Sequence, residues 1–366
     1  MAYRTFVGLD VHARSVRAFA VDVVTGEVRE KSLDADPGSA IDWCLGLAGP
    51  VRAVYEAGPT GFGMAREFAA AGVDVVVAAP SLLPVVPGNR VKTDKRDARR
   101  LAEALAAGQV TGVWVPSVAQ EAARDLFRCR EDAQIEFKAA AHRLSKLLLR
   151  NGLVWDRDTW TKAHLTWIMK VRFGDVCQQA ALDSYLDQVQ QLTRRKAHLE
   201  TLIAAEAAKP MWKPQVDALV CLRGVGVLTA FGLAVEVGDW QRIDPRKAGA
   251  YFGLAPVERS SGESRWLGGI AKTGNGHVRR LLVEAARKHA RAYQASSSPS
   301  LQRAYANVSP AVAAKAAQAN RRLAAQARKH ATAKKHPNRT AVAVAREMAG
   351  FCRDLAVMAR READAD

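Results

Sequence analysis

Apolar runs and turn signals alternate regularly along the first third of this 366-residue chain. Three consecutive strands are predicted there, the last two joined by a turn at Thr25-Gly26, at residues 5–10, 15–22 and 27–32. Helices and strands are then predicted to alternate, at residues 39–47, 52–56, 61–71, 73–79 and 94–107. The segment from Pro80 to Arg90 holds three prolines and a glycine, and it is expected to form a loop before the last helix.

This element order, βββ-α-β-α-β-α, determines the expected fold class. Three consecutive strands followed by helix-connected strands give a mixed sheet with helices on its faces. The order is that of an RNase H-like fold. We therefore expect an α/β N-terminal domain of the RNase H/RuvC-like type.

Long, charged helical stretches follow from about Val118 to Ala208. Apolar positions recur at heptad-like spacing in two helices, at Leu126, Ala133, Phe137, Ala140, Leu144 and Leu147, and at Leu182, Tyr185, Val189, Leu192, Leu199 and Ile203. A segment with Trp155, Trp160 and Trp167 separates them. The pattern fits a helical hairpin packed on its own chain and a dimerising coiled coil equally well, so an all-α coiled-coil linker is expected, with a dimer or tetramer as the expected assembly.

Glycine-rich turns and basic residues mark the region after Pro214. Arg223, Gly224 and Gly226 lie in a Gly-x-Gly turn between two apolar segments, as in a helix-hairpin-helix, where backbone N–H groups can hold a phosphate. The same glycines could instead serve tight helix packing. Farther on, Lys272, Arg279 and Arg280 flank a glycine-rich stretch that we expect to be flexible, and their charges are suited to phosphate.

The distribution of charge indicates a polyanionic partner. The chain has a net charge of +17 and a pI near 10.0. Residues 1–109 carry 13 basic and 13 acidic residues, whereas residues 259–340 carry 17 basic residues and only Glu263 and Glu284 as acids. Such asymmetry favours nucleic acid over an ordinary solvated surface.

Other compositional signals exclude several protein classes. No apolar run approaches the length of a membrane span, and no signal-peptide pattern is seen, so no membrane partner is expected. The 5 cysteines are scattered and never spaced as C-x-x-C, which argues against a zinc site or a disulfide framework. A cytoplasmic location with reduced thiols is therefore predicted.

Four acids carry the strongest chemical signal. Asp10 and Glu56 close apolar strands, and Asp94 and Asp97 lie three residues apart at the start of a helix, where both project from one side. Taken singly, each acid is more often a cap. Together they could converge on one pocket, where their mutual repulsion would require a cation. Carboxylate oxygens suit Mg²⁺, and paired metal ions commonly serve in-line displacement at phosphate.

These motifs resemble one family: the DEDD transposases of the insertion-sequence one-hundred-and-ten type, which are also called bridge recombinases and are related to Piv-like invertases. The segments that carry the resemblance are Gly8-Leu9-Asp10, Glu56 to Gly61, Lys92 to Arg99, Arg223 to Gly226, Gly253 to Pro256, Ser261-Gly262 and Lys272 to Asn275. The match spans both ends of the chain in the right order, whereas the intervening helices match only in character.

The resemblance implies a mechanism and partners. It implies that Asp10, Glu56, Asp94 and Asp97 bind metal in a RuvC-like domain of a prokaryotic protein. It further implies a serine nucleophile at the position of Ser261, with Ser260 and Ser264 as adjacent competitors. Members of the family also use a structured bridge RNA that pairs with donor and target DNA, so sequence specificity would come from base pairing.

We therefore predict three parts: a RuvC-like domain (1–112), a helical linker (113–215) and a basic, mostly α C-terminal transposase domain (216–366). The predicted function is cleavage and religation of insertion-sequence DNA. Two alternatives stay open, namely a RuvC-like structure-specific nuclease or resolvase without a covalent intermediate, and a non-enzymatic scaffold that binds nucleic acid. The role of the alanine-rich segment 294–335 is left open by the sequence.

Overall fold

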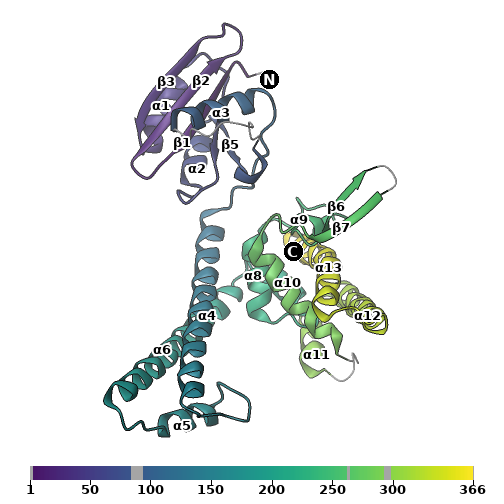
Figure 1. Cartoon of the computed structure of the whole chain (residues 1–366). Coiled ribbons are helices and arrows are strands. Elements are labelled where there is room, and N and C mark those ends of the chain that lie inside the picture. The colour runs from purple at the N-terminus through teal and green to yellow at the C-terminus, as the bar shows by residue number, and fades with distance from the viewer. Residues whose placement is uncertain (1–2, 84–93, 262–263, 292–297, 366) are drawn as a thin grey trace. The chain divides into compact units, whose positions relative to one another are not determined.

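The computed structural model describes residues 3–83, 94–261, 264–291 and 298–365 (Figure 1). The chain divides into two compact units, Met1–Ser117 and Val118–Asp366. The helices predicted as a separate linker lie in the second unit. The division into three parts by role stays a prediction.

A mixed five-stranded sheet forms the centre of the first unit, with strand order β3-β2-β1-β4-β5. The strands are β1 (Thr5–Val11), β2 (Ser15–Asp22), β3 (Val28–Asp34), β4 (Val51–Glu56) and β5 (Asp74–Ala78). The helices are α1 (Pro37–Leu45), α2 (Gly63–Ala70) and α3 (Asp94–Ala106), with a short 3₁₀ turn η1 (Pro80–Leu82). The α/β class and the predicted element order are confirmed. Most of the predicted loop between Pro80 and Arg90 lies outside the described residues.

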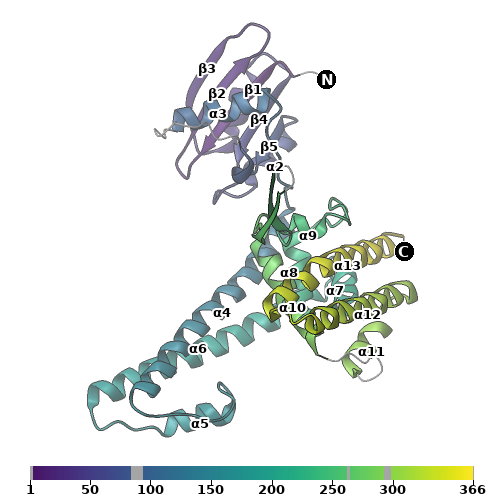
Figure 2. The ribbon, with the colours of Figure 1, turned by 45° about the vertical axis from the view of Figure 1, so that its right-hand side comes forward.

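Helices cover both faces of this sheet (Figure 2). Val7 and Leu9 of β1 point toward α1 and α2 and are fully buried with them. The alternate residues of β1 face α3, as side chains of a strand must alternate between faces. Gly8 allows this contact, because a Cβ at that position would collide with the backbone of Ala98 and lie 2.6 Å from the amide nitrogen of Ala102. The backbone of α3 therefore rests directly on β1.

The second unit begins with a helical hairpin. It consists of α4 (Val118–Arg150), α5 (Lys162–Lys170) and α6 (Val176–Ala207). Pairs between α4 and α6 run in opposite directions, since Arg143 donates to Gln188 at 3.1 Å and Arg195 to Glu136 at 3.3 Å. Most of the predicted heptad positions are buried between the two helices, so the hairpin packed on its own chain is confirmed. Dimerisation stays a prediction.

The rest of the second unit is a helical core with one two-stranded ribbon. Its elements are α7 (Lys213–Val220), α8 (Val227–Val237), α9 (Ala248–Tyr251), β6 (Pro256–Ser261), β7 (Ser264–Ile270), α10 (Gly276–Ala286), η2 (Arg287–Ala290), α11 (Pro299–Ala306), α12 (Pro310–Thr332) and α13 (Pro337–Ala365). In the described parts of the chain, no helix is both long enough and apolar enough to cross a membrane.

The alanine-rich segment has a structural role that its sequence left open. Ala316, Ala319 and Ala324 of α12 are buried against the neighbouring helices, and α13 packs on α7, α10 and α12. Small side chains let helix axes approach closely, and they leave few voids. This segment therefore completes the core of the second unit.

Candidate functional site

Two of the predicted acids lie at one edge of the sheet. β1 and β4 are parallel neighbours with Leu9 opposite Tyr55, so the next residues of the two strands, Asp10 and Glu56, adjoin. Parallel strands end at the same edge of a sheet. The side chain of Asp10 is 21% exposed and that of Glu56 is 37% exposed, so both are within reach of a ligand from solvent.

Both acids face the side of the sheet that α3 covers. Asp10 has the same orientation as Gly8, which touches the α3 backbone. Glu56 has the same orientation as Val54, which is fully buried with the α3 residue Leu101. An ion pair of 3.2 Å between Glu56 Oε1 and an Arg100 guanidinium nitrogen confirms this orientation.

The other two predicted acids are on α3 itself. Asp97 is half-buried and directly precedes Ala98, the residue whose backbone meets Gly8. Asp94 is the first residue of α3, but its side chain lies outside the described residues. The topology therefore brings Asp10, Glu56 and the first turn of α3 to one side of one sheet.

The donor set suits a hard divalent cation, because it offers carboxylate oxygens at accessible positions. Asp10 Oδ2 is 3.1 Å from His12 Nε2, and Glu56 is paired with Arg100. Among the residues whose placement is described, no three His, Cys, Asp or Glu side chains are close enough together to hold a metal ion. Asp94 is not among these residues, because its side chain lies outside the described part of the chain. A four-acid metal site therefore stays a prediction.

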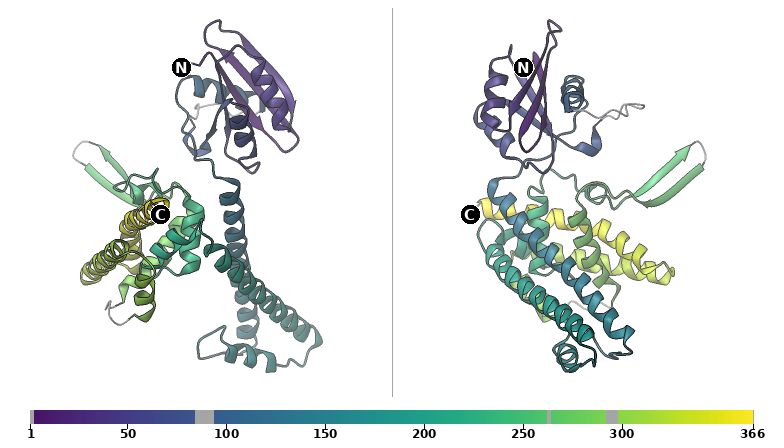
Figure 3. Two further views of the ribbon diagram at one scale, coloured as in Figure 1. Left: turned by 180° about the vertical axis from the view of Figure 1, so that it is seen from behind. Right: turned by 60° about the vertical axis from the view of Figure 1, so that its left-hand side comes forward.

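The predicted nucleophile lies on the two-stranded ribbon of the second unit. Strands β6 and β7 form this ribbon, which projects from the helices of the second unit (Figure 3). Ser261 is the last residue of β6 and pairs with Ser264 of β7. The side chain of Ser261 and residue Gly262 lie outside the described residues. Of the two competitors, Ser260 donates its hydroxyl to Glu258 Oε1 at 2.9 Å.

Backbone contacts fix the base of this ribbon. Gly253 and Gly274 both have positive φ, 67° in each case, and any Cβ there would collide with the facing backbone. The guanidinium of Arg279 donates to the carbonyl oxygens of Phe252 (3.0 Å) and Thr273 (2.8 Å). Arg279 therefore joins the two chain segments that lead into and out of the ribbon.

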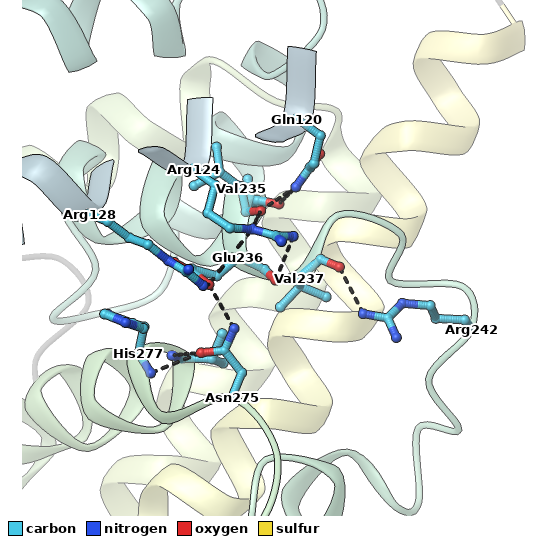
Figure 4. A network of polar contacts seen from close by, with 11 residues as sticks. Gln120, Arg124, Arg128, Val235, Glu236, Val237, Arg242, Asn275 and His277 are labelled. Carbon is cyan, nitrogen blue, oxygen red and sulfur yellow. Dashed lines mark hydrogen bonds and ion pairs between the residues drawn. The ribbon is translucent and has the colours of Figure 1, made fainter. Parts of the chain in front are cut away.

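The buried carboxylate of Glu236 contacts Asn275, next to Gly274 at the base of the ribbon (Figure 4). The side chain of Glu236, at the end of α8, is 0% exposed. Its two oxygens accept from Arg128 of α4 at 2.8 and 2.9 Å, and one also accepts from Asn275 Nδ2 at 2.7 Å. Asn275 caps α10 through its Oδ1, which accepts from the amides of His277 and Val278. One carboxylate thus links α4, α8 and the start of α10.

This network keeps Glu236 ionised. Burial raises the pKa of the Glu236 carboxyl, but hydrogen bonds from Arg128 and Asn275 outweigh burial and hold the pKa below its usual range. Because the pKa is lowered in the folded state, the carboxylate stabilises the fold above the ordinary glutamate pKa. That contribution is lost as the pH falls below it, through the folded value.

We predict that Glu236→Gln lowers the free energy of unfolding by about 3 kcal/mol, since one partner of a buried charged pair is removed. Breaking a buried charged pair costs about 3 to 5 kcal/mol. Arg128 is 43% exposed and can regain water, so the effect should be at the lower end of these values. The matched control is Glu284→Gln, whose exposed pair with Arg280 (3.0 Å) should contribute less than about 1 kcal/mol. Urea denaturation followed by circular dichroism measures both, and equal effects would contradict the prediction. The difference between wild type and Glu236→Gln should also shrink at acid pH.

Most of the predicted phosphate contacts have intramolecular partners. The guanidinium of Arg223 donates to the Arg291 carbonyl at 2.9 Å, and Arg280 pairs with Glu131 and Glu284. Gly224, with φ of 89°, lies against the carbonyl of Ala285, so tight packing accounts for this glycine.

Gly226 and Lys272, the other two predicted phosphate contacts, differ from the residues above. Gly226 is the exposed N-cap of α8 and makes no side-chain cap hydrogen bond. Lys272 is exposed, and its ammonium has no ion pair among the described residues. Nucleic-acid binding by all these residues stays a prediction.

Sequence reasoning missed the residues that hold the ribbon. Glu236 stands alone in an otherwise apolar run, Leu233-Ala234-Val235-Glu236-Val237, and an acid in such a run signals a buried, paired charge. Nothing in the sequence identifies Arg128 as its partner, because the two residues are 108 positions apart.

Comparisons with known proteins agree with this architecture. The model of the DEDD transposases matches residues 7–151, which include Asp10, Glu56, Asp94 and Asp97, and the model of the "Transposase IS116/IS110/IS902 family" matches residues 217–305. A putative transposase, y4qE, of Sinorhizobium fredii is 37% identical over 97% of this chain and 89% of its own length. The transposase for insertion sequence element IS1533 of Leptospira borgpetersenii is 28% identical over 66% of this chain and 72% of its own length. The chain therefore belongs to the IS116/IS110/IS902 family of transposases.

Proposed function

We propose that this transposase cleaves and rejoins the DNA of an insertion sequence, with a divalent metal at Asp10, Glu56, Asp94 and Asp97 and with Ser261 as nucleophile. The observation that carries the metal assignment is the position of Asp10 and Glu56 at adjoining strand ends. Both face the side of the sheet covered by α3, the helix that starts at Asp94 and carries Asp97. Four acids would then act at one sheet edge.

The acids would hold Mg²⁺, which supplies charge stabilisation at the scissile phosphate and activates the attacking group. Asp10 and Glu56 would bind from the sheet, and Asp94 and Asp97 from the helix. Arg100 now neutralises Glu56, and we expect it to release that carboxylate when the cation binds. The close contact between Gly8 and α3 would hold the helical acids at a fixed height above the strands.

The serine would conserve the phosphodiester bond. Its Oγ attacks phosphorus and forms an O–P bond, while the bond from phosphorus to one deoxyribose oxygen breaks. The serine proton passes through a base at the site to the leaving oxygen, which becomes a hydroxyl. Attack by a deoxyribose hydroxyl on the phosphoserine reverses these steps, joins the new strands and restores the serine, so no external energy source is needed.

Recognition of the DNA sites is proposed to depend on a structured bridge RNA that pairs with donor and target. Base pairing would read sequence, and the protein would contact the sugar–phosphate backbone. Support for this is the resemblance together with the basic C-terminal third of the chain. Assembly into a dimer or tetramer belongs to the same proposal.

The test incubates the wild-type protein and its element-encoded RNA with a nicked suicide substrate, with Mg²⁺ or with EDTA. A metal-dependent covalent protein–DNA adduct supports the proposal. Metal-dependent hydrolysis without an adduct would overturn the serine mechanism in favour of a RuvC-like nuclease or resolvase. Binding without metal-dependent cleavage would reduce the protein to a scaffold.

A further inference from the structure

A long acid-free stretch follows α10. Residues 285–346 contain 13 Lys and Arg residues and no Asp or Glu. Much of this stretch, residues 306–346, lies beyond the segment that the family model matches. Its buried alanines complete the core, but they give no reason for the exposed cations between them.

The fold places η2 beside α12 and α13, so several of these cations lie on adjoining elements. The 3₁₀ turn η2 packs on α12 and α13, and the Arg287 guanidinium donates to Asn338 Oδ1 at 3.2 Å, at the start of α13. Six exposed residues of η2, α12 and the α12–α13 turn form what we call the basic pole: Lys288, Arg291, Arg328, Lys329, Lys334 and Lys335.

The cations of the basic pole lack the ion pairs that two other cations of α12 form. Lys315 pairs with Asp354 at 2.8 Å, and Arg322 pairs with Glu347. Within the described ranges, none of the six residues of the pole forms an ion pair. A lysine in the last helical turn, such as Lys329, is favoured by the helix dipole. That explanation does not extend to η2 or to the turn.

His330 lies next to the charges of the basic pole. The pKa of His330 is lowered by partial burial and by the charges of Lys335 and Lys329. His330 is therefore harder to protonate than a free histidine. A polyanion would relieve this concentration of like charge.

We propose that the basic pole is a docking surface for the phosphate backbone of duplex DNA that flanks the recombining site. Among the described residues of 285–346 the one Phe, Trp or Tyr side chain is Tyr305, which packs on the core, so these residues offer no exposed Phe, Trp or Tyr on which single-stranded bases could stack. Arg321, outside the pole, is exposed seven residues before Arg328 on α12, about 10.5 Å along the helix, so positive charge continues along α12 and suits the regularly spaced phosphates of a duplex.

The inference goes beyond the proposed chemistry, because it requires neither the serine nor the metal. Its test compares two variants of the full-length protein that lose equal charge. The pole variant carries Arg328→Gln, Lys329→Gln, Lys334→Gln and Lys335→Gln. The control carries Lys138→Gln, Lys146→Gln, Arg150→Gln and Lys162→Gln, which are exposed on the α4–α5 part of the hairpin. Affinity for a 30-base-pair duplex of arbitrary sequence is measured by fluorescence anisotropy at several salt concentrations.

Each phosphate contact contributes about 0.9 to the slope of log affinity against log salt, so the pole variant should flatten that slope by roughly 2 to 3.5. The control should change it by less than about 1. Equal slopes for the two variants would overturn the inference. It would also be overturned if the pole variant lost affinity only for duplex RNA and not for duplex DNA. A pole variant that changed only the self-association of the protein would overturn it too. Both variants alter exposed side chains, and circular dichroism verifies that the helices are retained. Adduct formation on a short suicide substrate should persist in the pole variant, which separates this test from that of the proposed function.

Discussion

Asp10→Asn is expected to reduce recombination by about 10³-fold. Metal stabilisation of charge at phosphate is worth several kcal/mol, and each 1.4 kcal/mol is a factor of ten in rate. Asparagine keeps the shape of the side chain but removes a charged metal ligand at the end of β1. Asp97→Asn should have a similar effect from α3.

The matched control is Asp42→Asn, an exposed acid of α1 on the opposite face of the sheet. This variant should recombine at the wild-type rate. A second measurement is independent of catalysis: Mg²⁺ or Mn²⁺ should raise the melting temperature of wild type and of Asp42→Asn, because a ligand of the native state stabilises it. Asp10→Asn should lose this shift. In EDTA its melting temperature should equal or exceed that of wild type, since one of several neighbouring carboxylates has been neutralised. Near-normal recombination by Asp10→Asn would refute the metal assignment.

The sheet of the first unit could be predicted from the sequence because its strands are short apolar runs closed by turns. Val7 and Leu9 alternate with residues of the other face, and the parallel pairing of β1 with β4 follows from the helix between them. Asp10 and Glu56 were recognisable as strand ends for the same reason. The close approach of α3 was not, although Gly8 within a strand was a local signal of it.

The ribbon could not be predicted in this way. β6 reads Pro-Val-Glu-Arg-Ser-Ser, a largely polar and exposed strand with no buried face to produce an apolar alternation. Its position depends on contacts from far along the chain, such as those of Arg279 with Phe252 and Thr273. The Glu236–Arg128 pair is likewise tertiary. Local patterns reveal elements, whereas such pairings appear only when the elements are assembled.

The alanine-rich segment is a third part of the chain in which sequence and structure can be compared. Ala316, Ala319, Leu323 and Ala327 recur at helical spacing and are buried on one face of α12, although the sequence alone left the role of this segment open. The exposed cations between them were counted as one basic region. Within that region the structure distinguishes Arg279 and Arg280, which have protein partners, from the residues of the basic pole, which form no ion pair among the described residues.

Ser261→Ala is expected to abolish the covalent protein–DNA adduct while leaving nucleic-acid affinity unchanged. The substitution removes one hydroxyl at the end of β6, so the ribbon and its base contacts should persist. Without that oxygen no phosphoserine ester can form, and the bond energy needed for religation cannot be stored. The loss should be complete on a suicide substrate, where wild type accumulates the adduct.

The adjacent serines provide the controls. Ser260→Ala removes a hydrogen bond to Glu258, and Ser264→Ala alters the strand partner of Ser261; both should retain the adduct if position 261 alone supplies the nucleophile. Peptide mapping of the wild-type adduct should place the DNA on Ser261. If Ser261→Ala cleaves and rejoins at near the wild-type rate, the serine assignment is wrong. The acids of the first unit would then act on a water molecule, as in a RuvC-like nuclease, and the ribbon would serve to hold DNA.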